Sequence, residues 1–387
     1  MNIQSDFPVF QKMPFTNCCG CEACANVCPK QIIRFKEDGE GFRFPDINNE
    51  ECVHCGACVR VCPQLKEPFL KIEIRECYAG YSQNPEIVEM SSSGGYFTHI
   101  VEWFKREYPQ GKFAGVIWSD DFRYTEFVLF DNLDDLKNIR VAKYIQARKN
   151  GIYHLIKKEL LSGTPILFSG CPCEVAALVS CIGKIPDNLF LVDFVCKGST
   201  SEKVMREYLD IVAKNKKIKS LNLRVVGGLS WIPQWMKMTF SDGKIIFKSY
   251  YSTILGRAFH LLQRDACYKC KHCGENRYSD LTLGDFHGAD PNRRYYNARG
   301  TSIMTVNTSK GKKILDYLKD VCVVEKVSYE EIFKHNPRIE HAWDKDPKRD
   351  LFGSTLSKKG LFAAYLKVST KKYAIKTVLK RIFNQPI

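Results

Sequence analysis

Two runs of regularly spaced cysteines stand near the beginning of this 387-residue chain. Both have the pattern C-x2-C-x2-C-x3-C-P, so the second run repeats the first. They consist of Cys18, Cys21, Cys24 and Cys28, and of Cys52, Cys55, Cys58 and Cys62. Thiolates at such steps converge on the corners of one metal cluster, and the doubled run is typical of bacterial domains with two [4Fe-4S] clusters. The chemistry that this pattern predicts is electron transfer.

The doubled run also predicts which thiols share a cluster, because the fourth cysteine of each run ligates the other cluster. The first predicted set is Cys18, Cys21, Cys24 and Cys62, and the second is Cys28, Cys52, Cys55 and Cys58. Between the runs, alternating apolar positions around residues 38–41 predict a β-hairpin. Cys19 has the wrong spacing and remains a spare thiol. The alternative is a pair of zinc sites, although zinc ligands usually form two CxxC pairs with a longer insert.

The composition, with 44% hydrophobic and 26% charged residues, is that of a globular protein and excludes the disordered, collagen-like and coiled-coil classes. At about 150 residues per domain, the length predicts two to three domains. No run approaches the ~18 apolar residues of a membrane span, and the N-terminus lacks the basic and apolar regions of a secretory signal. We therefore expect a soluble, cytoplasmic protein whose dense thiols are metal ligands rather than disulfides.

The formal net charge of +15 is distributed unevenly along the chain. Residues 1–70 carry a net charge of −2, whereas the segment 357–387 holds eight basic side chains and no acidic one. The positive excess lies in the body and the tail, where it favours phosphate-bearing cofactors and acidic redox partners. A generally basic, solvated surface is the alternative. We expect no nucleic-acid partner, because no known nucleic-acid module is present.

After Pro63 the sequence alternates between strand-like and helix-like segments, which predicts an α/β body. A second hairpin is predicted over residues 234–251, with its turn at 241–244. The other predicted strands cover residues 77–82, 113–119, 124–131, 165–170 and 189–196. The predicted helices cover residues 96–108, 150–163, 173–182 and 201–215.

The serine- and glycine-rich segment 91–95 stands directly before a predicted helix. Small residues let backbone N–H groups approach an anion, and the dipole at a helix N-terminus favours negative charge. The segment therefore predicts a phosphate or pyrophosphate site. A flexible capping loop explains it equally well, because serine is a preferred N-cap residue.

A second group of cysteines occurs in the body. Its members are Cys171, Cys173, Cys196, Cys267, Cys270 and Cys273. The first two follow a predicted strand and Cys196 ends another, and strand ends of an α/β sheet meet at the edge that binds ligands. Four thiolates gathered there would hold a third cluster; zinc and inert, buried cysteines are the alternatives. Inert core positions are expected for Cys77, Cys181 and Cys322.

Residues 279–288 predict a strand that ends in Gly284 and Asp285. This would place one carboxylate at the carboxyl end of the strand, near Cys267, Cys270 and Cys273. An ordinary aspartate turn is the alternative.

Together these segments resemble the coenzyme F420 hydrogenase/dehydrogenase beta-subunit family, in the family's order, from Cys18 to about Lys319. The resemblance implies an iron–sulfur flavoprotein that binds FAD and moves electrons between clusters and a hydride acceptor, which is coenzyme F420 in methanogens. Many bacterial relatives, some associated with surface-polysaccharide synthesis, have no assigned substrate. Besides the cysteine runs, the matching segments are SSSGGYFTHI, AKYIQA, PILFSGCPCEVAAL, VDFVCKGSTS, CYKCKHCGENRYSDLTLGDFHG and RGTSIMTVNTSKG.

The resemblance also implies the roles of individual residues. A cradle for the FAD pyrophosphate is implied at Ser92, Ser93, Gly94 and Gly95. The other implied cofactor-binding residues are Lys143, Tyr144, Gln146, Ser169, Gly170 and Asp285, of which Lys143 and Asp285 are the candidates for a catalytic role. The implied ligands of the third cluster are Cys173, Cys196, Cys267 and Cys270. The additional thiols Cys171 and Cys273 leave the fourth ligand open.

The chain departs from the family pattern near these residues. Ala142 replaces serine, Cys171 replaces threonine, and Lys197 replaces histidine. His287 stands where tryptophan is usual, beside the implied flavin site, so the resemblance leaves the substrate open.

We therefore expect a bacterial-type two-cluster ferredoxin domain (1–70), a mixed α/β body with FAD and a third cluster (71–340), and a basic tail (341–387) that is helical. Such an iron–sulfur flavoprotein oxidoreductase would exchange electrons with a ferredoxin or another redox partner protein and hydride with a small molecule. The alternative is an electron-transfer subunit without flavin.

The tail mixes apolar residues with lysines at roughly helical spacing. A helix of this kind packs on the body with its lysines outward, which is the first expectation. The alternative is that it lies on an anionic membrane surface, which would place the protein peripherally at the inner face of the membrane.

Overall fold

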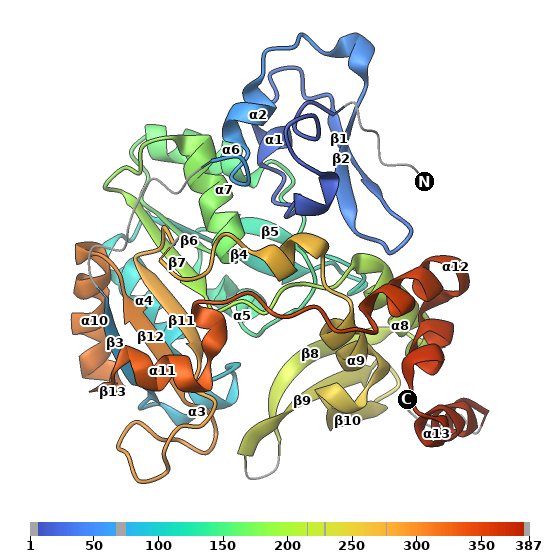
Figure 1. Ribbon diagram of the computed structural model, residues 1–387. Coiled ribbons are helices and arrows are strands. Elements are labelled where there is room, and N and C mark those ends of the chain that lie inside the picture. The colour runs from blue at the N-terminus through green and yellow to red at the C-terminus, as the bar shows by residue number, and fades with distance from the viewer. Residues whose placement is uncertain (1–6, 67–74, 215, 228–229, 276, 383–387) are drawn as a thin grey trace.

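The computed structural model describes residues 7–66, 75–214, 216–227, 230–275 and 277–382 (Figure 1). An N-terminal head with a two-stranded sheet lies against a larger body, whose main sheet has eight strands. A three-stranded sheet and the C-terminal helices stand beside the main sheet. In the described residues, no helix is both long and apolar enough to span a membrane.

The elements of the described residues follow in chain order. The strands are β1 (Ile33–Glu37), β2 (Arg43–Ile47), β3 (Glu76–Ser82), β4 (Lys112–Trp118), β5 (Thr125–Phe130), β6 (Ile166–Ser169), β7 (Leu189–Phe194), β8 (Ile218–Gly227), β9 (Ser230–Phe240), β10 (Ile245–Ser249), β11 (Leu281–Asp285), β12 (Ser302–Val306) and β13 (Cys322–Lys326). The α-helices are α1 (Ala23–Asn26), α2 (Ala57–Val61), α3 (Pro85–Glu89), α4 (Tyr96–Glu107), α5 (Leu136–Ile139), α6 (Ile152–Leu161), α7 (Pro172–Ile182), α8 (Glu202–Ala213), α9 (Ile254–Leu261), α10 (Ser309–Val321), α11 (Tyr329–His335), α12 (Arg349–Val368) and α13 (Lys371–Ile382). Short 3-10 helices cover Phe15–Asn17, Asn49–Glu51, Leu133–Asp135, Tyr250–Ser252, Asp265–Lys269 and Pro337–Ile339.

The main sheet has the strand order β13-β3-β12-β11-β7-β6-β4-β5. Its central strands β11, β7, β6 and β4 are parallel, whereas β12, β3, β13 and β5 pair antiparallel with their neighbours. The carboxyl ends of the parallel strands meet at one edge, which in α/β sheets is the edge that binds ligands. The fold therefore brings together the candidate residues that follow β6, β7 and β11.

The central strands are apolar on both faces because helices cover both sides of the sheet. On β6, Leu167 packs into the core that contains α4 and α10. Its neighbours Ile166 and Phe168 point the other way, into the core that contains α6 and α7. This alternation follows from the two-residue period of a strand, and it explains why residues 165–170 read as a short buried strand.

The predicted elements of the body are confirmed, and their boundaries move by only a few residues. One detail of the prediction was wrong: Cys196 does not end β7, which stops at Phe194, because the parallel pairing with β11 ends there. Both predicted hairpins are confirmed as β1–β2 and β9–β10. Residue 215 of the last predicted helix, residues 67–74 around the predicted domain boundary, and residues 1–6 and 383–387 at the ends lie outside the described residues.

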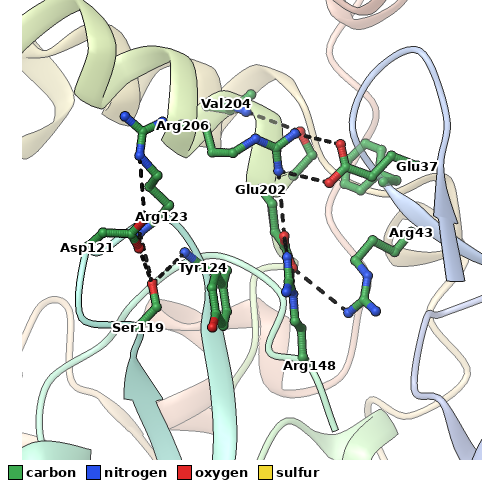
Figure 2. A network of polar contacts seen from close by, with 12 residues as sticks. Glu37, Arg43, Ser119, Asp121, Arg123, Tyr124, Arg148, Glu202, Val204 and Arg206 are labelled. Carbon is green, nitrogen blue, oxygen red and sulfur yellow. Dashed lines mark hydrogen bonds and ion pairs between the residues drawn. The ribbon is translucent and has the colours of Figure 1, made fainter. Parts of the chain in front are cut away.

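Charged side chains join the head to the body, as Figure 2 shows. Glu202, at the start of α8, accepts hydrogen bonds of 2.9 and 2.6 Å from Arg148. One turn later, Arg206 donates bonds of 2.8 and 2.6 Å to Glu37 of β1. Arg43 of β2 lies 3.9 Å from Glu202. The hairpin of the head is thus held by a helix of the body.

Apolar contacts reinforce this attachment. Cys19, Cys21, Ala23 and Val61 of the head share one buried core with the side chains of α6 and α7. Burial of apolar surface contributes roughly 25 cal/mol per Å², whereas an exposed ion pair contributes about 1 kcal/mol or less. The head is therefore packed on the body as part of one core.

Candidate functional site

The two cysteine runs have the same local geometry. Glu22 and Gly56 occupy equivalent positions in the two runs, and each precedes a short helix with a left-handed φ, of 61° and 70° respectively. Glycine adopts this conformation without cost, whereas for glutamate it is unfavourable. Glu22 is held in place because its carboxylate accepts hydrogen bonds from the Lys149 amide (3.1 Å) and the Arg43 guanidinium (3.0 Å). The sequence repeat is therefore also a structural repeat.

The first predicted set of thiols is brought together in the structure. Cys24 lies close enough to Cys18 and Cys62 to interact electrostatically with both, and Cys21 interacts with Cys62 in the same way. Burial raises the pKa of the Cys18 thiol to about 11 and that of Cys62 to about 12. Such thiols stay protonated unless a metal binds them, because a coordinated thiol loses its proton outright.

The second predicted set surrounds a small cavity of about 140 Å³. The cysteines that line it are Cys28, Cys52, Cys55 and Cys58. The crossing is present in the structure, since Cys28 comes from the first run and the other three come from the second. In the described residues, no three Cys, His, Asp or Glu side chains converge on a single metal ion. The thiols of this set line the walls of a cavity, as the ligands of a cluster must.

A much larger cavity, of about 930 Å³, lies at the carboxyl ends of β6, β7 and β11. This volume is at the upper end of the range of ordinary ligand pockets, about 300–1,000 Å³. Its walls include the segment before α4, residues 139–147, the N-terminus of α7, the loop after β7 and the loop after α9. Segments far apart in the sequence therefore form one site.

All six cysteines of the second group line this cavity, and so does Cys19 of the head. Hydrogen bonds join their side chains in pairs: Cys171 with Cys196, Cys270 with Cys273, and Cys19 with Cys173. The bond from Cys270 lowers the pKa of Cys273 to about 6, whereas burial raises the pKa of Cys267 to about 12.

Backbone N–H groups also point at two of these sulfurs. The Gly198 amide lies 3.3 Å from Cys196 Sγ, and the His272 amide lies 3.4 Å from Cys270 Sγ. Hydrogen bonds to cluster sulfurs are one of the means by which proteins set reduction potentials. By number, burial and hydrogen bonding, the thiols of the cavity fit a third cluster.

Lys143 is a buried cation in the wall of the same cavity. Its ammonium donates hydrogen bonds to the carbonyls of Arg140 (3.1 Å) and Val141 (3.2 Å), and burial lowers its pKa to about 7. Arg140, whose pKa burial also lowers, donates to Thr98 at 3.1 Å. Within the described residues neither cation forms an ion pair with a carboxylate, an arrangement that fits a phosphate-bearing group.

The residues implied as a pyrophosphate cradle are divided between the cavity and the sheet. Ser92, Ser93 and Gly95 line the cavity, and Gly95, with a φ of 93°, caps α4. Gly94 instead packs against β3 and β12: its N–H donates to Ser302 Oγ at 2.8 Å, and a Cβ there would lie 2.4 Å from the carbonyl oxygen of Gly80. The glycines of this segment therefore serve close packing and a turn.

Side chains of this segment also bond to the protein. Ser92 Oγ accepts a hydrogen bond from the Ala142 amide at 2.9 Å, and Ser93 Oγ donates to the Thr301 carbonyl at 2.8 Å. A serine hydroxyl that accepts one bond still has a proton to donate. The segment 91–95 thus meets residues 140–143 at one end of the cavity.

Asp285 lies at the end of β11, as predicted, and lines the cavity. It pairs with Arg224 of β8 at 2.5 Å, and His287 Nε2 lies 3.6 Å away. Desolvation lowers the pKa of His287, whose ring stacks on Trp231 with centroids 5.6 Å apart. The buried Nε and Nη2 of Arg224 have no hydrogen-bond partner in the described residues, which fits a bound acceptor group.

The remaining predicted residues also reach the cavity. Tyr144 stacks on Tyr250 and Phe259 at 5.0 and 4.7 Å between centroids. The Gln146 amide donates to the Cys19 carbonyl at 2.6 Å and accepts from Arg264 at 3.1 Å, so it ties the head to the cavity wall. Ser169 and Gly170, at the end of β6, lie at the same edge.

Sequence reasoning missed two kinds of site residue. Cys19 was expected to be a spare thiol, yet it lines the cavity beside Cys173. Its position next to a cluster run was the one available signal. Arg140 and Arg224 carry no motif, and only tertiary contacts place them. The expected inert positions of Cys77, Cys181 and Cys322 are confirmed, because each lies in an apolar core.

Comparisons with known proteins found two family models that match the chain. Residues 163–331 match the model for the C-terminal part of the beta subunit of coenzyme F420 hydrogenase/dehydrogenase, and residues 17–65 match the 4Fe-4S dicluster domain. Among solved structures, the chain is similar to a chain of the F420-reducing [NiFe] hydrogenase complex from Methanosarcina barkeri. That likeness has 16% identity and a TM-score of 0.47, and covers 83% of this chain and 98% of the other. The comparison with curated proteins returned no match.

The match to the dicluster domain includes all eight cysteines of the two head sets and decides between clusters and zinc in favour of clusters. The other match includes all six thiols of the second cysteine group. The chain therefore combines a match to the 4Fe-4S dicluster domain with a match to the C-terminal part of the beta subunit of coenzyme F420 hydrogenase/dehydrogenase, and together the two matches support iron–sulfur electron transfer of the oxidoreductase type.

Proposed function

We propose that this protein is an iron–sulfur flavoprotein that exchanges single electrons with a ferredoxin-type partner and hydride with a small molecule. One observation carries the proposal: a single cavity is lined both by seven thiols and by cations that form no ion pair within the described residues. When bound, clusters supply one-electron transfer and FAD supplies hydride chemistry. The substrate is coenzyme F420-like or belongs to an unassigned class, such as an intermediate of polysaccharide synthesis.

The cations supply the binding energy for a flavin nucleotide. Lys143 and Arg140 would neutralise the pyrophosphate, and Ser92 would donate its hydroxyl proton. Asp285 and Arg224 form a polar pair inside the cavity, which suits the orientation of a ring with polar edges. These side chains would bind the flavin nucleotide and orient its ring. No acid–base pair of the protein is required, because the hydride chemistry is that of the cofactor.

A third cluster would be held at the carboxyl ends of β6 and β7. Its proposed ligands are Cys173, Cys196, Cys267 and Cys270, all in the cavity wall. Cys171 would act as a hydrogen-bond donor to the ligand Cys196. Cys273, which accepts from the Cys270 thiol in the structure, would donate to Cys270 once that residue ligates the cluster as a thiolate.

The second thiol set of the head offers a docking place for a redox partner protein. Cys55 is exposed, and the neighbouring Val53 exposes 54% of its surface. A cluster near the surface can exchange electrons with a protein that binds there only briefly. We therefore place the exchange of single electrons at this end of the head.

The test is to purify the protein without oxygen and to measure iron, acid-labile sulfide and released FAD. We expect about twelve iron atoms per chain, from three [4Fe-4S] clusters, and one FAD. Lys143→Met should lose most of the FAD and keep the iron, whereas Lys334→Met, on the exposed side of α11, should lose neither.

A specific observation favours the second candidate, an electron-transfer subunit without flavin. The Gly94 amide and the Ser93 hydroxyl, which would cradle a pyrophosphate, already donate to protein atoms. Full iron and sulfide with no FAD, before and after reconstitution with FAD, would reject the flavoprotein and leave this candidate.

A further inference from the structure

A second group of cations lines the large cavity away from Lys143. It consists of Lys197 after β7, Arg257 on α9 and Arg338 within the last 3-10 helix. Lys197 Nζ lies 2.9 Å from His260 Nδ1, and both Lys197 and Arg338 face the ring of Trp343, at 4.5 and 3.2 Å from its centroid. In the described residues, none of the three cations forms an ion pair with a carboxylate.

Other cations of the cavity differ in this respect. Arg277 pairs with Asp193 at 3.0 Å, and Arg224 pairs with Asp285. A cation removed from water without a negative partner is costly, so buried cations are normally paired. Arg338 lacks such a partner in the described residues, and burial accordingly lowers its pKa to about 10. A bound anion would supply the missing negative charge.

The group comes from other segments than the cations proposed to hold the pyrophosphate, Arg140 and Lys143. The Phe259 ring contacts the Tyr144 ring, with centroids 4.7 Å apart, and its centroid lies 5.4 Å from Lys197 Nζ. Arg257 is exposed, whereas Lys197 and Arg338 are half-buried. The arrangement leads from solvent into the cavity, as an entry route for an anion does.

We propose that Lys197, Arg257 and Arg338 bind the phosphate or carboxylate group of the small substrate. Guanidinium groups match both anions with two parallel hydrogen bonds, and the lysine adds a point charge. The inference rests on the proposed function, because it places the substrate in the same cavity as the flavin and the third cluster. It narrows the substrate class to small anionic molecules.

The experiment titrates the iron- and FAD-loaded protein calorimetrically with inorganic phosphate and, separately, with succinate, at fixed ionic strength. Arg338→Ala and Lys197→Ala should each weaken the binding of the preferred anion about tenfold or more, and Arg338→Lys should weaken it less. The control Lys334→Ala removes a nearby exposed charge and should change nothing. The preferred probe tells whether the substrate group is phosphoryl or carboxylate.

The inference is overturned if Arg338→Ala binds phosphate and succinate as tightly as the wild type does. It is also overturned if Lys334→Ala loses as much affinity as Arg338→Ala. Unchanged iron and FAD contents show that the variants fold. Absence of FAD from a wild type that binds phosphate through Arg338 would instead reject the proposed function while the anion site stands.

An independent observation concerns α13, whose exposed face differs from the first expectation for the tail. Its apolar side chains Ile375, Val378 and Leu379 expose 61, 37 and 47% of their surfaces. At spacings of three and four residues, they share one face of the helix. The opposite side carries the buried Thr377 and Arg381, whose guanidinium lies 4.2 Å from the ring centroid of Phe362 on α12.

The exposed face therefore carries the apolar residues, and the exposed lysines Lys371, Lys372 and Lys376 border it. We infer that this face of α13 lies on an anionic lipid surface. Charge complementarity selects this occupant, because the segment 357–387 holds eight basic side chains and no acidic one. Apolar side chains with bordering lysines are the arrangement of helices that lie in the membrane interface.

Flotation of the full-length protein with vesicles tests the lipid inference. Vesicles of phosphatidylglycerol and phosphatidylcholine should carry the wild type upward at low salt, and vesicles of phosphatidylcholine alone should not. The double variant Ile375→Ser with Leu379→Ser should remain unbound, whereas Ile245→Ser, which changes an exposed residue of β10 (53%), should bind normally. No flotation of the wild type, or an equal loss in both variants, overturns the inference and leaves a protein as the occupant.

Discussion

The second thiol set of the head and the thiols of the large cavity differ in how the chain assembles them. In the head, four cysteines within residues 28–58 surround one small cavity; three come from one local run, and Cys28 comes from the end of the other. In the body, the thiols come from Cys19, residues 171–173, Cys196 and residues 267–273. Local spacing is enough to specify the first arrangement, whereas the second exists only once β6, β7 and β11 lie side by side.

The difference teaches what a cysteine pattern can establish. The spacing of the head runs predicts both the cofactor and the partition of ligands, because three cysteines of each run share one cluster and the fourth ligates the other. The spacing of the body cysteines predicts only that a strand end lies near. The following experiments test this contrast, from the largest expected effect to the smallest.

The largest effect is expected for a thiol of the head. Cys52→Ala should remove one cluster, about four of the iron atoms, and leave FAD and the body cluster in place, because the second set stands apart from the large cavity. Iron analysis and low-temperature electron paramagnetic resonance measure the loss. Cys77→Ala, which changes a buried core thiol, should keep all the iron. Loss of the body cluster from Cys52→Ala would show that the two regions do not assemble separately.

The free energy of unfolding should depend strongly on one buried ion pair of the body. Lys149 is completely buried and lies 2.8 Å from Glu174, which also accepts a hydrogen bond from the Cys171 amide at 2.9 Å. Lys149→Met leaves this carboxylate buried without its partner and should cost about 3–5 kcal/mol of unfolding free energy.

The matched comparison is Glu37→Gln, which breaks the partly exposed pair with Arg206 and should cost about 1 kcal/mol or less. Denaturant unfolding of both variants measures the difference. Similar costs for the two changes would contradict the dependence on burial.

Flavin binding should depend on pH through Lys143. Because burial lowers the pKa of this ammonium to about 7, the flavin-free protein carries the charge below pH 7 and loses it above. Affinity for FAD should therefore fall as the pH rises, by about tenfold between pH 6 and pH 9, the scale of one charged hydrogen bond. Lys143→Met should bind weakly at both values. An equal slope in the variant would assign the titration to another group.

The smallest effect is expected for Cys19, the thiol that links the two regions. In the structure Cys173 donates to Cys19, but once Cys173 ligates the cluster as a thiolate, Cys19 can only donate to it. That bond would stabilise the reduced form of the body cluster, so Cys19→Ala should lower the cluster's potential by about 40 mV, which corresponds to about 1 kcal/mol. Cys19→Ser, which keeps a donor, should lower it less. Redox titration measures both. A loss of iron from Cys19→Ala would make the residue a ligand instead.

Much of the fold follows from the sequence alone. The repeat of the cysteine runs, the hairpin at residues 38–41 and the strands at 113–119 and 165–170 are all present. These features depend on contacts between neighbours in the chain: metal-binding loops, turn residues and the alternation of strand side chains. The sequence therefore determined the dicluster head, the α/β class of the body and the edge at which a site would form.

Only the tertiary structure decided which residues meet at that edge. Arg140, Arg224 and Arg338 come from segments whose local patterns carry no sign of a site, and the tertiary fold brings them to one cavity. The outward apolar face of α13 is likewise set by what the helix packs against, since its periodicity is the same in either orientation. The physical reason is that propensity and spacing act over a few residues, whereas burial and ion pairing are properties of the assembled chain.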